Sequence, residues 1–135
     1  MTIRGVRGAT VAAENSVHAI LAATRELLHV MLEANPGLET SDIGSAFFTV
    51  TEDLDATYPA LAARSIGWTQ VPMLCAREIP VPNSLPRVIR VLLHWNTDRP
   101  QGEICHAFLH EAAKLRPDLA SVEENGSAPL DLTIT

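Results

Sequence analysis

Arg90 is the residue of this chain most clearly placed to do chemistry, because it lies inside the most apolar run, residues 88–93 (VIRVLL). The run is rich in β-branched residues, which favours a buried or half-buried strand. An unpaired guanidinium would be costly there, so we expect an anionic group to meet Arg90. Alternation along a strand places Val88, Arg90, Leu92 and His94 on one face, opposite an apolar face of Ile89, Val91, Leu93 and Trp95. The face that carries Arg90 therefore has the character of a cleft wall.

Arg7 is a second embedded arginine, placed in the run IRGVRG between two glycines that let a backbone or a ligand come close. With Cys75, Glu78, Arg90 and Arg116 it belongs to a set of polar residues at the ends of predicted elements. Three arginines and one carboxylate suit a small polyanion that bears a hydroxyl group, since guanidinium forks match carboxylates and Glu accepts from an alcohol. The alternative is internal Arg–Glu pairing, and the residue types alone leave both readings open.

The chain has no nucleophile elbow, phosphate loop, dinucleotide fingerprint or zinc-ligand spacing. His106 and His110 are four residues apart with Cys105 beside them, but a metal site normally needs a third converging ligand. We therefore expect no metal and no cofactor, and a solvated or capping role for both histidines. Cys75 lies in an apolar segment and is expected to be a packed thiol, with a weak hydrogen-bonding role left open.

Length and composition predict one domain that associates with copies of itself. The 135 residues fit a single core, and 47% hydrophobic with 19% charged residues is apolar for a small monomer. A net charge of −6 without a basic cluster argues against a nucleic-acid partner, and no apolar run is long enough to span a membrane. Two distant cysteines and no signal peptide favour a reduced, cytoplasmic protein.

The first half of the chain predicts alternating strands and helices. A strand over residues 3–8 precedes a helix capped by Asn15 or Ser16, with apolar residues at helical spacing from Val17 to Leu32. The helix should end at residues 35–37 (NPG). Residues 46–51 predict a second strand, and residues 59–66 a second helix with Thr57 as a possible cap.

The second half predicts strands at residues 71–75, 78–81 and 88–93. A proline-bearing turn over residues 82–86 should bring Glu78 back beside the Arg90 strand. Asp98 and Gln101 resemble a capping box, so a third helix is expected up to Pro117, with an apolar stripe of Ile104, Cys105, Phe108, Leu109, Ala112 and Leu115.

The predicted order β-α-β-α-β-β-β-α gives an α+β fold, a mixed β-sheet covered by helices on one face. The other face would then need a partner, and a neighbouring subunit is the simplest. The domain is expected over residues 1–120, with a loose C-terminal tail over 121–135.

Six ordered segments are similar to one family: residues 4–10 (RGVRGAT), 49–54 (TVTEDL), 75–78 (CARE), 85–91 (LPRVIRV), 95–98 (WNTD) and 115–119 (LRPDL). By these segments the chain resembles the AroH class of monofunctional chorismate mutase, the type found in Bacillus and Thermus. The resemblance implies a homotrimer that forms a pseudo α/β barrel, with active sites at the three subunit interfaces. It also implies conversion of chorismate to prephenate, in phenylalanine and tyrosine biosynthesis, by a Claisen rearrangement that needs no cofactor.

The resemblance further implies residue roles. Arg90, Glu78 and Arg7 would be catalytic: Arg90 at the ether oxygen and a carboxylate, Arg7 at the enolpyruvyl carboxylate, and Glu78 with Cys75 at the ring hydroxyl. Arg64 and Arg116 would add cationic field, and Tyr58 and Leu115 would line the mouth. The full substrate-binding set is Arg7, Tyr58, Arg64, Leu74, Cys75, Ala76, Arg77, Glu78, Arg90, Phe108, Leu115 and Arg116.

Two residues depart from the family pattern. Phe108 stands where the Bacillus-like pattern has a tyrosine, so we expect one hydrogen bond fewer and weaker substrate binding. Leu61 stands where some members carry a charged residue, so we transfer no contact to it.

Two other functions fit parts of the sequence. A catalytically quiet trimeric module that binds an anionic metabolite would use the same arginines. A RidA-like trimeric deaminase has a similar size, but its glycine-rich and C-terminal arginine motifs are not visible here.

Overall fold

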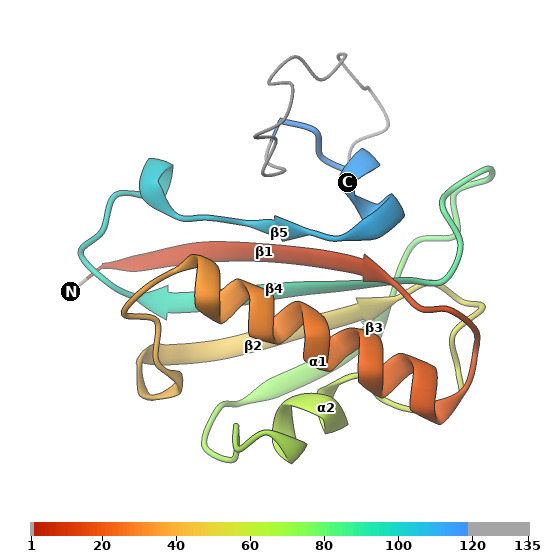
Figure 1. The fold of residues 1–135 in the computed structure, drawn as a ribbon, viewed down its shortest axis with the longest axis horizontal. Coiled ribbons are helices and arrows are strands. Elements are labelled where there is room, and N and C mark those ends of the chain that lie inside the picture. Colours follow the sequence, from red (N-terminus) through yellow and green to blue (C-terminus); the bar gives the residue numbers. More distant parts are fainter. Residues whose placement is uncertain (1, 119–135) are drawn as a thin grey trace.

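The computed structural model describes residues 2–118, which form a mixed sheet of five strands in the order β3-β2-β4-β1-β5 (Figure 1). The central strand β4 runs antiparallel to both of its neighbours, β1 and β2. The outer strands β3 and β5 pair in parallel with β2 and β1. The strands are β1 (Ile3–Val11), β2 (Ile43–Val50), β3 (Met73–Arg77), β4 (Val88–Asn96) and β5 (Ala107–Phe108). The α+β fold class is thereby confirmed.

Two α-helices, α1 (Val17–Ala34) and α2 (Ala60–Ser65), cover one face of the sheet (Figure 1). The hydroxyl of Ser16 accepts from the backbone N–H of Ala19, so Ser16 is the cap, and the helix ends at Asn35 as predicted. Three short 3₁₀ turns complete the set: η1 (Thr40–Asp42), η2 (Gln101–Glu103) and η3 (His110–Lys114). None of the described helices is long and apolar enough to cross a membrane.

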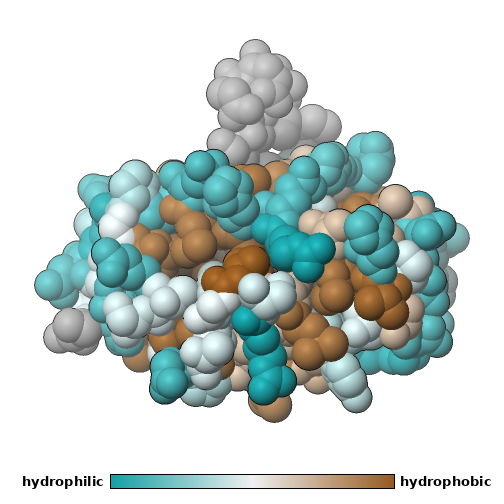
Figure 2. Space-filling view, turned by 60° about the horizontal axis from the view of Figure 1, so that its bottom comes forward, coloured by the Kyte–Doolittle hydropathy of each residue, from teal (hydrophilic) through white to brown (hydrophobic). Residues whose placement is uncertain are grey.

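The main core lies between the helices and the sheet. Its fully buried side chains include Leu27, Leu28, Met31, Phe48 and Leu93. Alternation along the strands sends Phe48 and Leu93 to the side of α1 and α2 and Arg90 to the opposite face. Within residues 2–118 no α-helix covers that opposite face, here called the uncovered face, although η3 packs over one end of it through Ala112. Leu74 is 64% exposed. In Figure 2, which brings the α2 and β3 side forward, hydrophobic side chains lie exposed among hydrophilic ones.

The predicted third helix is wrong, because residues 101–114 form η2, β5 and η3 instead. Side-chain hydrogen bonds instead join this segment to distant parts of the chain. The Gln101 amide bonds both the N–H and the C=O of Gly5, at 3.0 and 2.8 Å. The Asn35 amide likewise bonds the N–H and the C=O of Cys105, both at 2.8 Å. These contacts hold the segment extended against the edge of β1.

Two smaller expectations also fail. Residues 78–81 form no strand, because Pro80 lacks an N–H and Val81 donates back to the carbonyl of Ile79 at 2.8 Å. Thr57 does not cap the second helix, which begins after Pro59 without a side-chain cap in the described part of the chain. The tail predicted over residues 121–135 lies outside the described residues.

Candidate active site

Three adjacent strands and one loop place polar side chains on the uncovered face. Arg90 lies in β4 opposite Thr49 of β2 on one side and Ala9 of β1 on the other. Arg7 is two residues before Ala9, so it shares that face. Glu78 follows the last residue of β3, and its backbone N–H donates to the carbonyl of Val50 at 2.8 Å. The register of the sheet therefore brings these side chains together.

Glu78 is the anionic partner that the apolar run around Arg90 required. Its Oε1 lies 3.5 Å from Nη1 of Arg90, and the two side chains are 21% and 10% exposed. The pair borders a cavity of about 230 Å³ lined by Arg7, Phe47, Thr49, Glu78, Arg90, Val91 and Leu92. The ion pair between Arg90 and Glu78 therefore lies at the edge of a cavity, so both interpretations of the sequence apply to the same residues.

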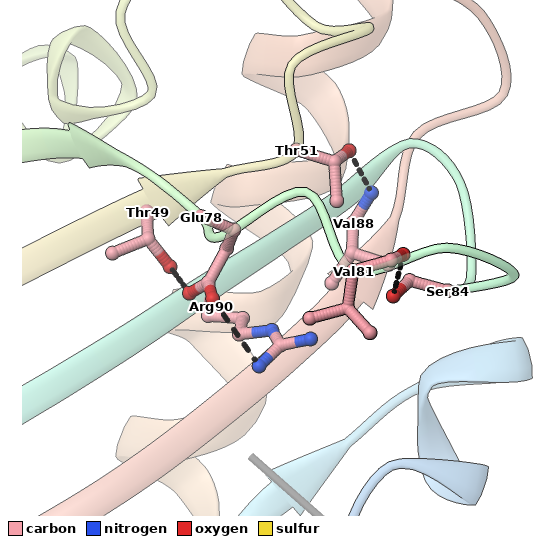
Figure 3. Close-up of polar contacts among 7 residues, drawn as sticks. All are labelled: Thr49, Thr51, Glu78, Val81, Ser84, Val88 and Arg90. Carbon is pink, nitrogen blue, oxygen red and sulfur yellow. Dashed lines mark hydrogen bonds and ion pairs between the residues drawn. The ribbon is translucent and has the colours of Figure 1, made fainter. Parts of the chain in front are cut away.

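The predicted turn does bring Glu78 back beside β4, and a side-chain network fixes where β4 begins. The Asp53 carboxylate accepts from the backbone N–H of Arg87 at 3.0 and 3.2 Å. The Thr51 hydroxyl donates to Asp53 at 2.5 Å. It also accepts from the N–H of Val88 at 3.0 Å, as Figure 3 shows. Arg87 has a φ of 54°, a strained value for a residue with a side chain, so the network holds a strained backbone position three residues before Arg90.

Arg7 lies over an aromatic ring and beside other cations. Its guanidinium carbon is 5.8 Å from the centroid of the Phe108 ring. Burial, and then the positive charges of Arg90 and Arg116, lower the pKa of Arg7, while Glu78 opposes the shift. Arginine remains a cation nonetheless. The uncovered face therefore brings Arg7 near the cations Arg90 and Arg116, with the Glu78 carboxylate among them.

His106 contacts the strand that carries Arg7 through a ring nitrogen. Nδ1 accepts from the backbone N–H of Arg7 at 2.9 Å, which requires that nitrogen to be unprotonated. Burial, followed by the charges of Arg7 and Arg116, lowers the pKa of His106, and Asp118 opposes the shift. The ring is held neutral and supports the strand that carries Arg7.

The remaining predicted residues do not converge on the same cavity within one chain. A separate cavity of about 580 Å³ beside α2 is lined in part by Tyr58, Leu61, Cys75, Ala76 and Arg77. The Cys75 side chain packs against the core on the helix side, and burial raises the pKa of its thiol. The packed thiol is as predicted.

Three further predicted residues line neither of these two cavities. Arg64 is exposed on α2. Leu115 is buried in a cluster with Val88 and Phe108. Arg116 pairs with Asp118 at 2.8 Å.

One residue of the site, Thr49, was not predicted from the sequence. Its hydroxyl donates to Oε2 of Glu78 and its side chain lines the cavity (Figure 3). Alternation along β2 could have placed Thr49 on the same face as Phe47. Nothing in the sequence indicates that Glu78 would fold back onto it.

The histidines near the C-terminal end have protein partners. His110 Nε2 lies 3.1 Å from Oε1 of Glu26, and His106 is occupied by Arg7 as above. Within residues 2–118 no group of three or more His, Cys, Asp or Glu side chains is placed to hold a metal ion.

An α+β chain with two arginines and a carboxylate around one cavity is suited to a small polyanion. The chain belongs to the family of type I chorismate mutases, whose family model matches residues 3–119. The chorismate mutase AroH of Thermus thermophilus is 55% identical over 121 residues, which cover 90% of this chain and 99% of that protein. The corresponding protein of Bacillus subtilis is 39% identical, over 89% of this chain and 94% of its own length.

A solved structure supports the same assignment. The chorismate mutase from Clostridium thermocellum Cth-682 superimposes with a TM-score of 0.80 at 49% sequence identity. The match covers 82% of this chain and 98% of that one.

Proposed function

We propose that this chain is an isomerase that rearranges chorismate to prephenate, as a step in phenylalanine and tyrosine biosynthesis. The observation that carries the proposal is the grouping of Arg7, Glu78 and Arg90 around one cavity on the uncovered face of the sheet. These side chains match a substrate with two carboxylates and a hydroxyl group. Family membership supports the particular reaction.

In this proposal the protein does no proton transfer and forms no covalent intermediate. The rearrangement breaks an ether bond while a carbon–carbon bond forms, and negative charge grows on the ether oxygen. Arg90 stabilises that charge, Arg7 holds the enolpyruvyl carboxylate, and Glu78 holds the ring hydroxyl. Catalysis then comes from selecting the reactive conformer and from preorganised charge.

We also propose that the working form is a homotrimer with its active sites between subunits. Two features support it. The uncovered face exposes Phe47 and Leu74, and the residues expected to bind one substrate are divided between two cavities of the single chain. Apposition of the two cavities from neighbouring subunits would bring Cys75 and Tyr58 to the Arg90 cavity. A cytoplasmic location and weaker binding caused by Phe108 stay predictions.

The reaction is tested by adding the purified protein to chorismate and following the loss of chorismate absorbance. The protein should come from a host without its own chorismate mutase. Saturable loss, with prephenate identified by chromatography, is the expected result. Binding of chorismate without conversion would contradict the proposal and favour the catalytically quiet binding module.

The shared site is tested by complementation between two variants. Arg90→Ala and Arg64→Ala chains are unfolded together in a 1:1 mixture and refolded. If one subunit supplies Arg90 and its neighbour supplies Arg64, random assembly restores both arginines at about a quarter of the sites. Activity well above the mean of the two separate variants is expected. Activity equal to that mean would contradict a site shared in this way.

A further inference from the structure

The two carboxylate oxygens of Glu78 have different partners. Oε2 accepts a hydrogen bond from the hydroxyl of Thr49, and Oε1 faces Nη1 of Arg90 at 3.5 Å (Figure 3). Arginine and a carboxylate tend to pair through two parallel hydrogen bonds. The Thr49 contact draws one oxygen away from that arrangement.

Both ends of the Thr49 contact are fixed by the sheet. Thr49 lies directly opposite Arg90 in the register of β2 and β4, and its branched side chain has few rotamers. The backbone of Glu78 is held by the carbonyl of Val50, the residue after Thr49. The Glu78 side chain has more torsional freedom than that of Thr49, so the hydroxyl restricts where its carboxylate can lie.

We propose that Thr49 is a positioning residue that sets the orientation of the Glu78 carboxylate. The inference rests on the proposed function of the site. With the hydroxyl present, Oε1 is presented toward the cavity beside Arg90, in the place where a substrate hydroxyl would donate. Without it, the carboxylate can turn into a two-oxygen pair with Arg90 and reduce the positive charge that Arg90 offers to the reacting ether.

The test compares Thr49→Val, which has nearly the same shape but no hydroxyl, with Thr49→Ser, which keeps the hydroxyl. We expect Thr49→Val to lower kcat/KM for chorismate about tenfold, mostly through kcat, because the lost effect acts on developing charge. Thr49→Ser should keep most of the wild-type rate. A Thr49→Ser variant as slow as Thr49→Val, or a Thr49→Val variant with wild-type kinetics, would overturn the proposal.

A double-variant cycle separates positioning from a general structural effect. In a Glu78→Ala background there is no carboxylate to orient, so Thr49→Val should change kcat little. An undiminished tenfold effect there would show that Thr49 acts independently of Glu78, which contradicts the proposal.

Thr10→Val is the matched control. Thr10 is buried in β1, and its hydroxyl has no hydrogen-bond partner among the described residues, so wild-type kinetics are expected. If the wild-type protein itself fails to convert chorismate, the proposed function fails first and the role of Thr49 falls with it. An active wild type that is unaffected by Thr49→Val overturns the role of Thr49 alone.

Discussion

The two faces of the sheet differ in burial and in charge, and two neighbouring residues of β2 show the difference. Phe48 is 0% exposed and packs among the helices, whereas Phe47 is 39% exposed and borders the arginine cavity. The helix face is closed and apolar, so it supplies most of the burial that stabilises the fold. The uncovered face holds the charged side chains. Stability and activity can therefore be perturbed separately in this protein.

The same division explains how β4 carries an arginine. Val91 and Leu93 point to the core, while Arg90 points to the opposite face and meets Glu78 and the cavity. A largely buried ion pair of this kind adds little net stability, because the cost of desolvating both charges offsets their attraction. Its presence in the most apolar strand points to function rather than to folding.

The largest expected effect comes from replacing the two adjacent phenylalanines, which tests the difference between the two faces of the sheet. Phe48→Ala should lower the free energy of unfolding by about 3–5 kcal/mol, because it opens a cavity in the closed core. Phe47→Ala should cost much less in stability and should alter chorismate kinetics or assembly instead. Chemical denaturation of both variants measures the difference. Equal losses of unfolding free energy would contradict the assignment of separate roles to the two faces.

Substitutions at two glycines of β1 should have a smaller effect on stability, and one of the two serves as the control for the other. A Cβ at Gly8 would lie 2.4 Å from Sδ of the buried Met31, whereas a Cβ at Gly5 would meet Cδ1 of Leu92 at an ordinary 3.6 Å. Gly8→Ala should therefore destabilise the protein by about 1–3 kcal/mol, the usual range for overpacking. Gly5→Ala should change the unfolding free energy much less. The order of the two denaturation midpoints checks the prediction, and the reverse order would refute it.

The smallest expected effect concerns pH. The pKa of His106 is lowered in the folded protein, so the unfolded chain binds a proton first as the pH falls below about 6.5. The stability that depends on neutral His106 is therefore complete above that pH and is lost as the pH falls through the lower folded pKa. Protonation would also displace the Arg7 N–H from Nδ1.

Unfolding free energies at pH 7.5 and pH 5.5 test this expectation. His106→Asn should lose less stability on acidification than the wild type, while His29→Asn, at an exposed histidine on α1, serves as the control. The same loss in His106→Asn as in the wild type would contradict the role given to His106.

Much of the fold was predictable because its signals are local. A cap at Asn15 or Ser16, the helical spacing up to Leu32 and the alternation around Arg90 each depend on neighbours in sequence. The structure confirms the last two and selects Ser16 as the cap. The prediction of a third helix was wrong because the hydrogen bonds that hold this segment extended come from residues distant in sequence. The amides of Asn35 and Gln101 bond the backbones of Cys105 and Gly5, at separations of 70 and 96 residues.

The site was predictable in part for the same reason. Arg90 was identifiable from its apolar neighbours, and the proline-bearing turn indicated that Glu78 would return to it. Thr49 was missed because its role depends on the pairing of β2 with β4 and on the path of Glu78 after β3. Neither the strand order nor a side-chain contact between distant segments is encoded in a local pattern.

The most direct measurement is the kcat of Arg90→Ala for chorismate beside that of Arg99→Ala. Arg99 also lies over an aromatic ring, 5.5 Å from the centroid of Trp95, but it does not line the cavity. We predict that Arg90→Ala loses on the order of a hundred- to a thousandfold in kcat at a temperature where the variant is folded. Its denaturation midpoint should fall, because the largely buried Glu78 carboxylate loses its partner. Arg99→Ala should keep the wild-type kcat. Near-wild-type turnover by Arg90→Ala would contradict the central claim that the uncovered face catalyses the reaction through this guanidinium.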